Sequence, residues 1–110
     1  MTTAALNLTA EATKLEDRAA AIEAGLAAVR HDEFLVMTSD VAGGLYITDI
    51  DGKWFARGAA VAQRMTERTA GAFATSARRT WPDAKPVRAV DALRSEAAQL
   101  REVAAQLRAV

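Results

Sequence analysis

Two carboxylates separated by a single residue are the side chains in this sequence best spaced to do chemistry. Asp49 and Asp51 flank Ile50, follow an apolar stretch and precede Gly52. Paired aspartates can divide nucleophilic attack and acid–base work between them, and together they can hold a magnesium ion. The same residues also favour a plain structural role, because Asp51-Gly52 between apolar residues is typical of a two-residue hairpin turn.

The six residues from Ile47 to Gly52 resemble the first motif of the haloacid-dehalogenase-like phosphatases. The resemblance implies that one aspartate is a nucleophile, that the other is an acid or base, and that the pair helps to hold magnesium. In that family the motif lies near the start of a much longer doubly wound domain. Lys53 stands where the family carries threonine, and the residues that follow are mainly helical in pattern. We therefore interpret Asp51-Gly52 as a turn and rank a phosphatase-like enzyme using Asp49 and Asp51 last among the functions.

Other catalytic and metal-binding chemistries lack their residues. The chain has one histidine and no cysteine, and it contains no Gly-x-Ser-x-Gly motif and no glycine-rich phosphate loop. His31, Asp32 and Glu33 could bind a metal weakly, but the end of a helix followed by a polar loop explains them as well. We expect no catalysis, no cofactor, no metal site and no small-molecule substrate.

The hairpin predicts a binding surface instead. A two-residue turn pairs Ile50 with Lys53, Thr48 with Phe55, and Tyr46 with Arg57. This register brings two aromatic and two cationic residues to one face of the sheet, namely Tyr46, Phe55, Lys53 and Arg57. Aromatics beside cations are frequent at protein hot spots and at sites that stack bases. The alternative is that Phe55 lies under a helix or a dimer partner.

A second candidate surface is Arg78, Arg79 and Trp81, with Lys85 and Arg88 nearby. Cations and an aromatic at a helix end could meet phosphates. The same cations would also suit the helix dipole, and Trp81 before a proline could be a core residue.

The spacing of apolar residues, together with capping and turn residues, predicts the strands and helices that position these side chains. Strands are predicted over Phe34–Thr38, Leu45–Ile50, Lys53–Arg57 and, at an edge after Pro86, Val87–Val90. Helices are predicted from Thr9, as N-cap, to about Arg30, from Thr66 as N-cap or from an earlier start near Ala59 to before Trp81, and after Asp91 as N-cap, with residues 1–8 frayed. The expected fold is α+β in one domain over residues 1–110. It comprises an N-terminal helix, a three-stranded antiparallel meander, a helix, a short edge strand and a C-terminal helix, with the helices mainly on one face of the sheet.

The two terminal helices carry matching alanine and leucine heptads. The first repeats apolar residues from Leu8 to Val29 and the last from Val90 to Leu107. Flanking positions hold Glu16 and Glu23 in one helix, and in the other a basic row of Arg94, Arg101 and Arg108. An antiparallel pair would set the two glutamates along that row. Alternatives are a homodimer through the heptads and helices that simply cover the sheet.

Charge and hydropathy limit the kinds of protein that this chain can be. The chain has 110 residues and no net charge, but residues 1–56 are acidic by five charges and residues 57–110 are basic by five. No apolar run is long enough to span a membrane, and the first residues lack a secretory signal pattern, so we expect a cytoplasmic protein.

These observations favour a non-catalytic protein–protein interaction module, either self-associating or acting as an adaptor or inhibitor of a larger assembly. Small cofactor-free chains of this kind are common among bacterial phage and mobile-element products, including anti-CRISPR-like inhibitors. The alternative is a nucleic-acid-binding protein that uses the basic C-terminal half.

Overall fold

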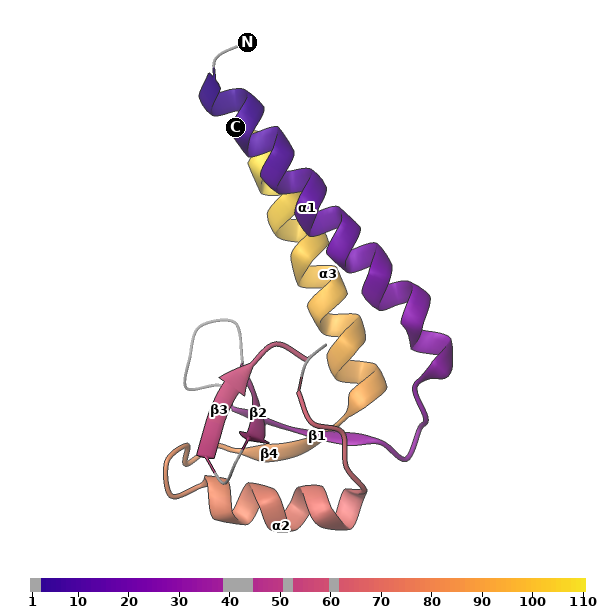
Figure 1. Cartoon of the computed structure of the whole chain (residues 1–110), viewed down its shortest axis with the longest axis vertical. Coiled ribbons are helices and arrows are strands. Elements are labelled where there is room, and N and C mark those ends of the chain that lie inside the picture. The colour runs from indigo at the N-terminus through magenta and orange to yellow at the C-terminus, as the bar shows by residue number, and fades with distance from the viewer. Residues whose placement is uncertain (1–2, 39–44, 51–52, 60–61) are drawn as a thin grey trace. The chain divides into compact units, whose positions relative to one another are not determined.

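A computed structural model describes residues 3–38, 45–50, 53–59 and 62–110, and side chains from residue 7 onward outside 39–57 and 60–61. The class is α+β, as predicted (Figure 1). The elements in chain order are α1 (Thr3–Gly25), a short 3-10 helix (Leu26–Ala28), β1 (Phe34–Thr38), β2 (Leu45–Ile50), β3 (Lys53–Arg57), α2 (Glu67–Ala77), β4 (Lys85–Arg88) and α3 (Ala89–Arg108). They form two compact units, residues 1–27 with 93–110, and residues 28–92. We call these the helical unit and the sheet unit.

The first helix is longer at its start and shorter at its end than predicted. It begins at Thr3, so Thr9 is an interior residue and not the N-cap; the Thr13 hydroxyl donates to the Thr9 carbonyl at 3.1 Å. The residues before Thr9 are mostly good helix formers, which outweighs the capping signal. The α-helix ends at Gly25, where the lowest helix propensity among non-proline residues falls, and continues only as the 3-10 turn.

The α1–α3 seam of the helical unit is built on alanine. Four seam alanines are at most 2% exposed, whereas the larger seam residues except Leu93 are half-buried. The buried alanines are Ala12, Ala19, Ala97 and Ala104, and the half-buried residues are Leu8, Leu15, Ile22, Leu26, Leu100 and Leu107. Small seam residues let two backbones approach closely. The alanines of the heptads are therefore the buried part of this seam, and most of the larger residues lie at its margins.

The sheet has four antiparallel strands in the order β3-β2-β1-β4. The fourth strand is Lys85–Arg88 and not Val87–Val90, because α3 already begins at Ala89. Pro86 lies inside β4 opposite Val36, and β4 is an edge strand, where a missing N–H costs no ladder bond on the open side. Asp91 lies in the first turn of α3 and is not its N-cap, although the helix dipole favours it there.

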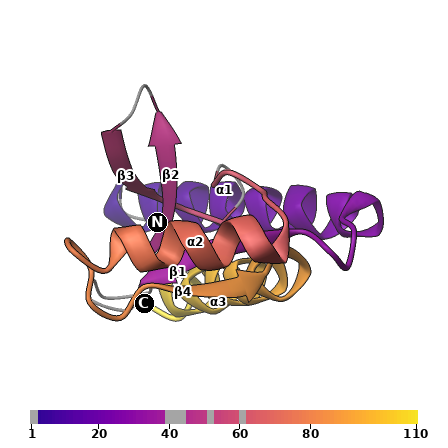
Figure 2. The ribbon, with the colours of Figure 1, turned by 90° about the horizontal axis from the view of Figure 1, so that it is seen from below.

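The second helix begins and ends as predicted. Thr66 has extended backbone angles and its hydroxyl accepts the Thr69 N–H at 3.2 Å, which makes it the N-cap. Glu67 lies in the first turn. The helix lies against β1 and β4 (Figure 2). Its alanines form the face that packs on the sheet. The core of the sheet unit on this side consists of Phe34, Val36, Met65, Ala70, Ala74, Ala77 and Ala84.

Two long-range contacts close the sheet unit. The backbones of Phe34 and Met65 exchange hydrogen bonds of 2.7 and 2.9 Å, an isolated bridge that fixes the start of β1 beside the segment before α2. Thr38, fully buried at the other end of β1, donates to Asp83 at 2.5 Å. Both ends of β1 are thus tied to the residues that flank α2.

Candidate functional site

The β2–β3 register matches the predicted pairing of the candidate site residues. Tyr46 lies opposite Arg57, Thr48 opposite Phe55 and Ile50 opposite Lys53. Only two residues, 51 and 52, connect the paired strands, and they lie outside the described residues, as do residues 39–44 between β1 and β2. The backbone therefore places Tyr46, Phe55, Lys53 and Arg57 at register positions on a single face.

That face is the one opposite α2. Val36 belongs to the core that contacts α2, and it pairs with Ile47, whereas Met37 pairs with Tyr46. Directly paired residues share a face and successive residues alternate between faces. Tyr46 and the residues in phase with it consequently lie on the side of the sheet away from α2.

On β1, the sheet face away from α2 is covered. Leu35 has no exposed surface and Met37 is half-buried, and both point away from the α2 core by alternation. Cover on this face therefore decreases along β1, from Leu35 toward Met37, which is the residue paired with Tyr46.

The fold implied by the phosphatase resemblance is not found. Asp49 is a residue of β2 opposite Trp54, and β2 leads into an antiparallel partner strand. A doubly wound domain would instead require a parallel sheet, and the sheet here is antiparallel throughout its described strands. Asp51 lies outside the described residues. The six-residue resemblance thus brings no matching architecture with it.

The second candidate set is used partly for structure. Arg78 is the C-cap residue of α2, and its Nε donates to the Ala84 carbonyl at 2.9 Å across the turn toward β4. Trp81 is half-buried and packs against the α2-side core. Arg79 is exposed. Trp81 therefore packs at the edge of the core.

The structure does not bring the two candidate sets together. Trp81 packs on the α2 side of the sheet, while Tyr46 and Phe55 occupy register positions on the opposite side. Trp81 therefore does not share a face of the sheet with the β2–β3 set.

A hollow of about 570 Å³ lies beside the start of α2, and no pattern in the sequence predicts it. It is lined by His31, Asp32, Phe34, Thr66, Glu67, Arg68 and Arg88. Asp32 already accepts two hydrogen bonds from Arg30, at 3.0 and 2.9 Å, and Glu33 beside it contacts Arg64 at 3.5 Å. The guanidinium of Arg88 lies 5.9 Å from the Phe34 ring centre. The hollow lies beside the Phe34–Met65 bridge, which no periodic pattern in the sequence predicts.

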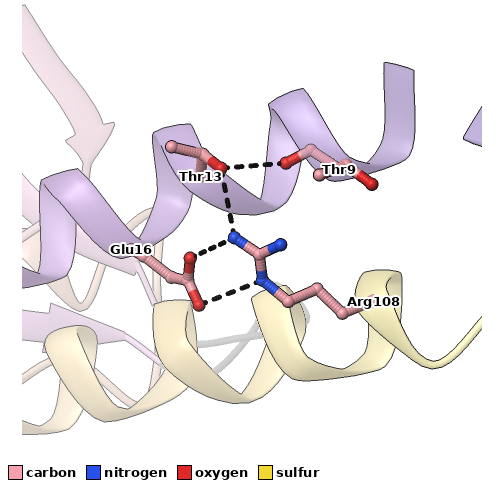
Figure 3. A network of polar contacts seen from close by, with 4 residues as sticks. All are labelled: Thr9, Thr13, Glu16 and Arg108. Atoms are coloured by element: carbon pink, nitrogen blue, oxygen red, sulfur yellow. Dashed lines mark hydrogen bonds and ion pairs between the residues drawn. The ribbon is translucent and has the colours of Figure 1, made fainter. Parts of the chain in front are cut away.

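Two of the predicted glutamate–arginine ion pairs join the two helices of the helical unit, and we call them the charge ladder. Glu16 pairs with Arg108, with oxygen–nitrogen distances of 2.5 and 3.2 Å, and Glu23 pairs with Arg101 (Figure 3 shows the first pair). Arg108 also donates to the Thr13 hydroxyl at 3.1 Å. These hydrogen bonds lower the pKa of both glutamate carboxyls and raise the pKa of both guanidinium groups. The predicted antiparallel orientation of the two helices is confirmed.

Folding removes the charge asymmetry seen along the sequence. The helical unit contains five basic and six acidic residues, and the sheet unit nine basic and eight acidic. The acidic and basic halves of the chain are interleaved because the first and last helices pair. Neither unit is strongly basic, so the division of the sequence into an acidic and a basic half does not correspond to a basic unit.

No helix in the described part of the chain combines the length and apolarity needed to cross a bilayer. Comparisons of the chain with protein-family models, with curated proteins and with solved structures find no match.

Proposed function

We propose that this chain is a non-catalytic protein-interaction module, acting as an adaptor or inhibitor, and that it contacts its partner through the β2–β3 hairpin. The observation that carries the proposal is the division of the sheet. The helix α2 packs against β1 and β4, whereas Tyr46, Lys53, Phe55 and Arg57 occupy the face away from α2. In Figure 2 the β2–β3 hairpin extends beyond α2.

The residue types support a protein partner. Aromatic residues and arginine are enriched in the parts of interfaces that contribute most binding energy, because they offer large contact areas together with a polar group. The register alternates such residues along the hairpin, Tyr46 opposite Arg57 and Phe55 between Lys53 and Arg57. The proposal includes the finer arrangement expected from the sequence, a three-stranded meander of β1, β2 and β3 whose β2–β3 part is left open on the face away from α2.

Nucleic-acid binding is the alternative function. The near balance of charge within each unit argues against it, because binding to phosphates depends on neutralising several of them with a concentrated basic surface. Arg78, a member of the second candidate set, is also held by the Ala84 carbonyl.

The test is site-specific photo-crosslinking in the native host. Benzoylphenylalanine placed at Phe55 should yield one defined protein adduct, while the same group at Ala72, an exposed α2 residue on the other side of the sheet unit, should not. Adducts at Ala72 but not at Phe55 would contradict the proposed surface. A nucleic-acid adduct, lost steeply between low and physiological salt, would favour the alternative function.

A further inference from the structure

The two edges of the sheet differ in how they are protected against further strand pairing. Edge strands expose unpaired backbone groups, and proteins usually block them with proline, bulges, charges or short length. The β4 edge has four residues, includes Pro86, and carries exposed cations at both ends, Lys85 and Arg88. The β4 edge is therefore a poor template for another strand.

The β3 edge carries fewer of these protections. It has five residues without proline, and its pairing to β2 runs unbroken from Ile50–Lys53 to Tyr46–Arg57, so it contains no bulge. Its centre, Trp54-Phe55-Ala56, is uncharged and includes two aromatics that favour strands. Within the described sheet, β3 has a strand neighbour on one side only. Alternate residues of such a strand direct N–H and C=O groups outward.

The charges on β3 select what can pair there. Lys53 and Arg57 stand two residues on either side of Phe55, and the β2 residues opposite them, Ile50 and Tyr46, are uncharged. In an antiparallel pair of two β3 strands centred on Phe55, each Lys53 would face an Arg57. Like charges directly opposite one another destabilise a strand pair. The centred register, which would pair all five residues, thus disfavours a second copy of this chain.

We infer that β3 accepts an extended segment of a partner protein as an added antiparallel strand, with acidic residues at its first and fifth positions and an apolar residue at its third. Main-chain hydrogen bonds supply the affinity of such added strands, and alternate side chains supply the specificity. The acidic residues would stand opposite Arg57 and Lys53, and the apolar residue opposite Phe55. This inference rests on the proposed function and specifies the partner's chemistry at the same hairpin.

The experiment titrates the full-length, nitrogen-15-labelled chain with synthetic peptides and follows its amide signals by NMR, which detects millimolar affinities. The probe is Ser-Glu-Thr-Val-Thr-Glu-Ser. Its charge-reversed counterpart is Ser-Lys-Thr-Val-Thr-Lys-Ser, and Ser-Glu-Glu-Thr-Val-Thr-Ser keeps the charge but breaks the spacing. The probe should bind about tenfold more tightly than the reversed peptide, since two favourable cross-strand pairs replace two unfavourable ones. Amide hydrogen exchange should slow within residues 53–57 and not within residues 85–88.

Charge reversal on the protein sharpens the test. The double variant Lys53→Glu/Arg57→Glu should exchange the preference and bind the lysine peptide more tightly. Lys85→Glu is the matched control, because it reverses an exposed cation on the proline-containing edge, and it should leave the preference unchanged. Amide spectra of all variants establish that the fold is retained.

Equal affinity for the probe and the scrambled peptide would overturn the inference, because it would show attraction by charge without strand pairing. Exchange protection of residues 53–57 in a dimer of the chain alone would overturn it as well. Failure of this inference is distinguishable from failure of the proposed function. If Phe55 crosslinks to a protein in the host but the probe does not protect β3, the hairpin binds a partner by its face and not by its edge.

Discussion

The helical unit and the sheet unit are held together by contacts of different kinds. In the helical unit the same contact recurs every seven residues: one heptad along α1 corresponds to one heptad back along α3, so Glu16–Arg108 and Glu23–Arg101 belong to one register. In an antiparallel coil of that register, Ala19 falls opposite Leu100 and Ala97 opposite Ile22. Each layer then combines a small residue with a large one, which fits the pattern of buried alanines and half-buried leucines.

The described contacts of the sheet unit instead join segments that lie at unrelated distances along the sequence. Its β1 strand pairs with β2, the next strand in sequence, and also with β4, the last strand, and its first residue bridges to Met65. Its core residues Leu35 and Val36 are fully buried, unlike the seam leucines, which except for Leu93 are half-buried. The periodic seam thus leaves most of its large residues half-buried, while the irregular contacts around β1 bury Leu35 and Val36 completely.

The largest expected effect tests this difference in burial. Leu35→Ala should lower the free energy of unfolding of the sheet unit by about 2–5 kcal/mol, because it leaves a cavity in a fully enclosed site. Leu100→Ala should cost about 1 kcal/mol, because its side chain is only half-buried. Both tryptophans belong to the sheet unit, so denaturant titration followed by tryptophan fluorescence reports on it, and circular dichroism weights the helices.

Equal costs for the two leucine variants would break the comparison. They would indicate that a second chain covers the helical unit and buries its leucines. Sedimentation equilibrium would then detect the homodimer that the heptads allow.

The second prediction concerns the narrowness of the seam. Ala97 is almost fully buried, and Ala97→Leu should destabilise the helical unit by about 1–3 kcal/mol, because the added side chain must push the two helices apart. The matched control is Ala98→Leu, at an exposed position one residue along the same helix. Thermal melting followed by circular dichroism measures both. A stabilised Ala97→Leu variant would mean that the seam can open at no cost.

The parts of the fold predicted from sequence are those with local or periodic signals. Thr66 marks the start of α2, and the heptads together with Glu16 and Glu23 predict the antiparallel helix pair and its ion pairs. The bounds of β1, β2 and β3 and the pairing across the hairpin follow from alternation and from the two-residue connection. The predicted start of α1 was wrong because helix propensity outweighed the capping signal at Thr9. The predicted start of β4 was wrong because an edge strand tolerates Pro86.

The parts that could not be predicted depend on contacts between distant residues. The Phe34–Met65 bridge and the Thr38–Asp83 hydrogen bond join segments with no shared pattern. The same holds for Arg78, whose role in binding the Ala84 carbonyl follows from the course of a turn and not from its residue type. For the candidate site, the sequence predicts that Tyr46, Lys53, Phe55 and Arg57 share one face of the hairpin. The strand register adds that this face is the one away from α2.

A smaller effect tests the local signal at α2. Thr66→Ala should lower the free energy of unfolding of the sheet unit by about 0.5–2 kcal/mol, because the Thr69 N–H loses its side-chain acceptor. Thr66→Ser keeps the oxygen and should restore most of the stability. Urea titration followed by tryptophan fluorescence compares the three proteins. An equal loss for serine and alanine would assign the effect to the lost methyl group and not to the cap.

The smallest effect is the pH dependence of the charge ladder. Hydrogen bonds from Arg108 and Arg101 hold the pKa values of Glu16 and Glu23 below the ordinary glutamate value of 4.5. A carboxyl whose pKa is lower in the folded state stabilises that state fully above its unfolded pKa, and the contribution disappears as the pH falls through the folded value. Glu16→Gln/Glu23→Gln should therefore melt below the parent protein at pH 7 and together with it at about pH 2.

The shift in melting temperature at pH 7 should be smaller than that of Thr66→Ala and should shrink in 1 M salt, since both ion pairs are exposed. Glu102→Gln, which removes an exposed α3 carboxylate that forms no ion pair among the described residues, should leave the pH dependence unchanged. If the double variant and the parent differ by the same amount at both pH values, the two carboxylates act through packing, and the charge ladder does not set the orientation of the helices.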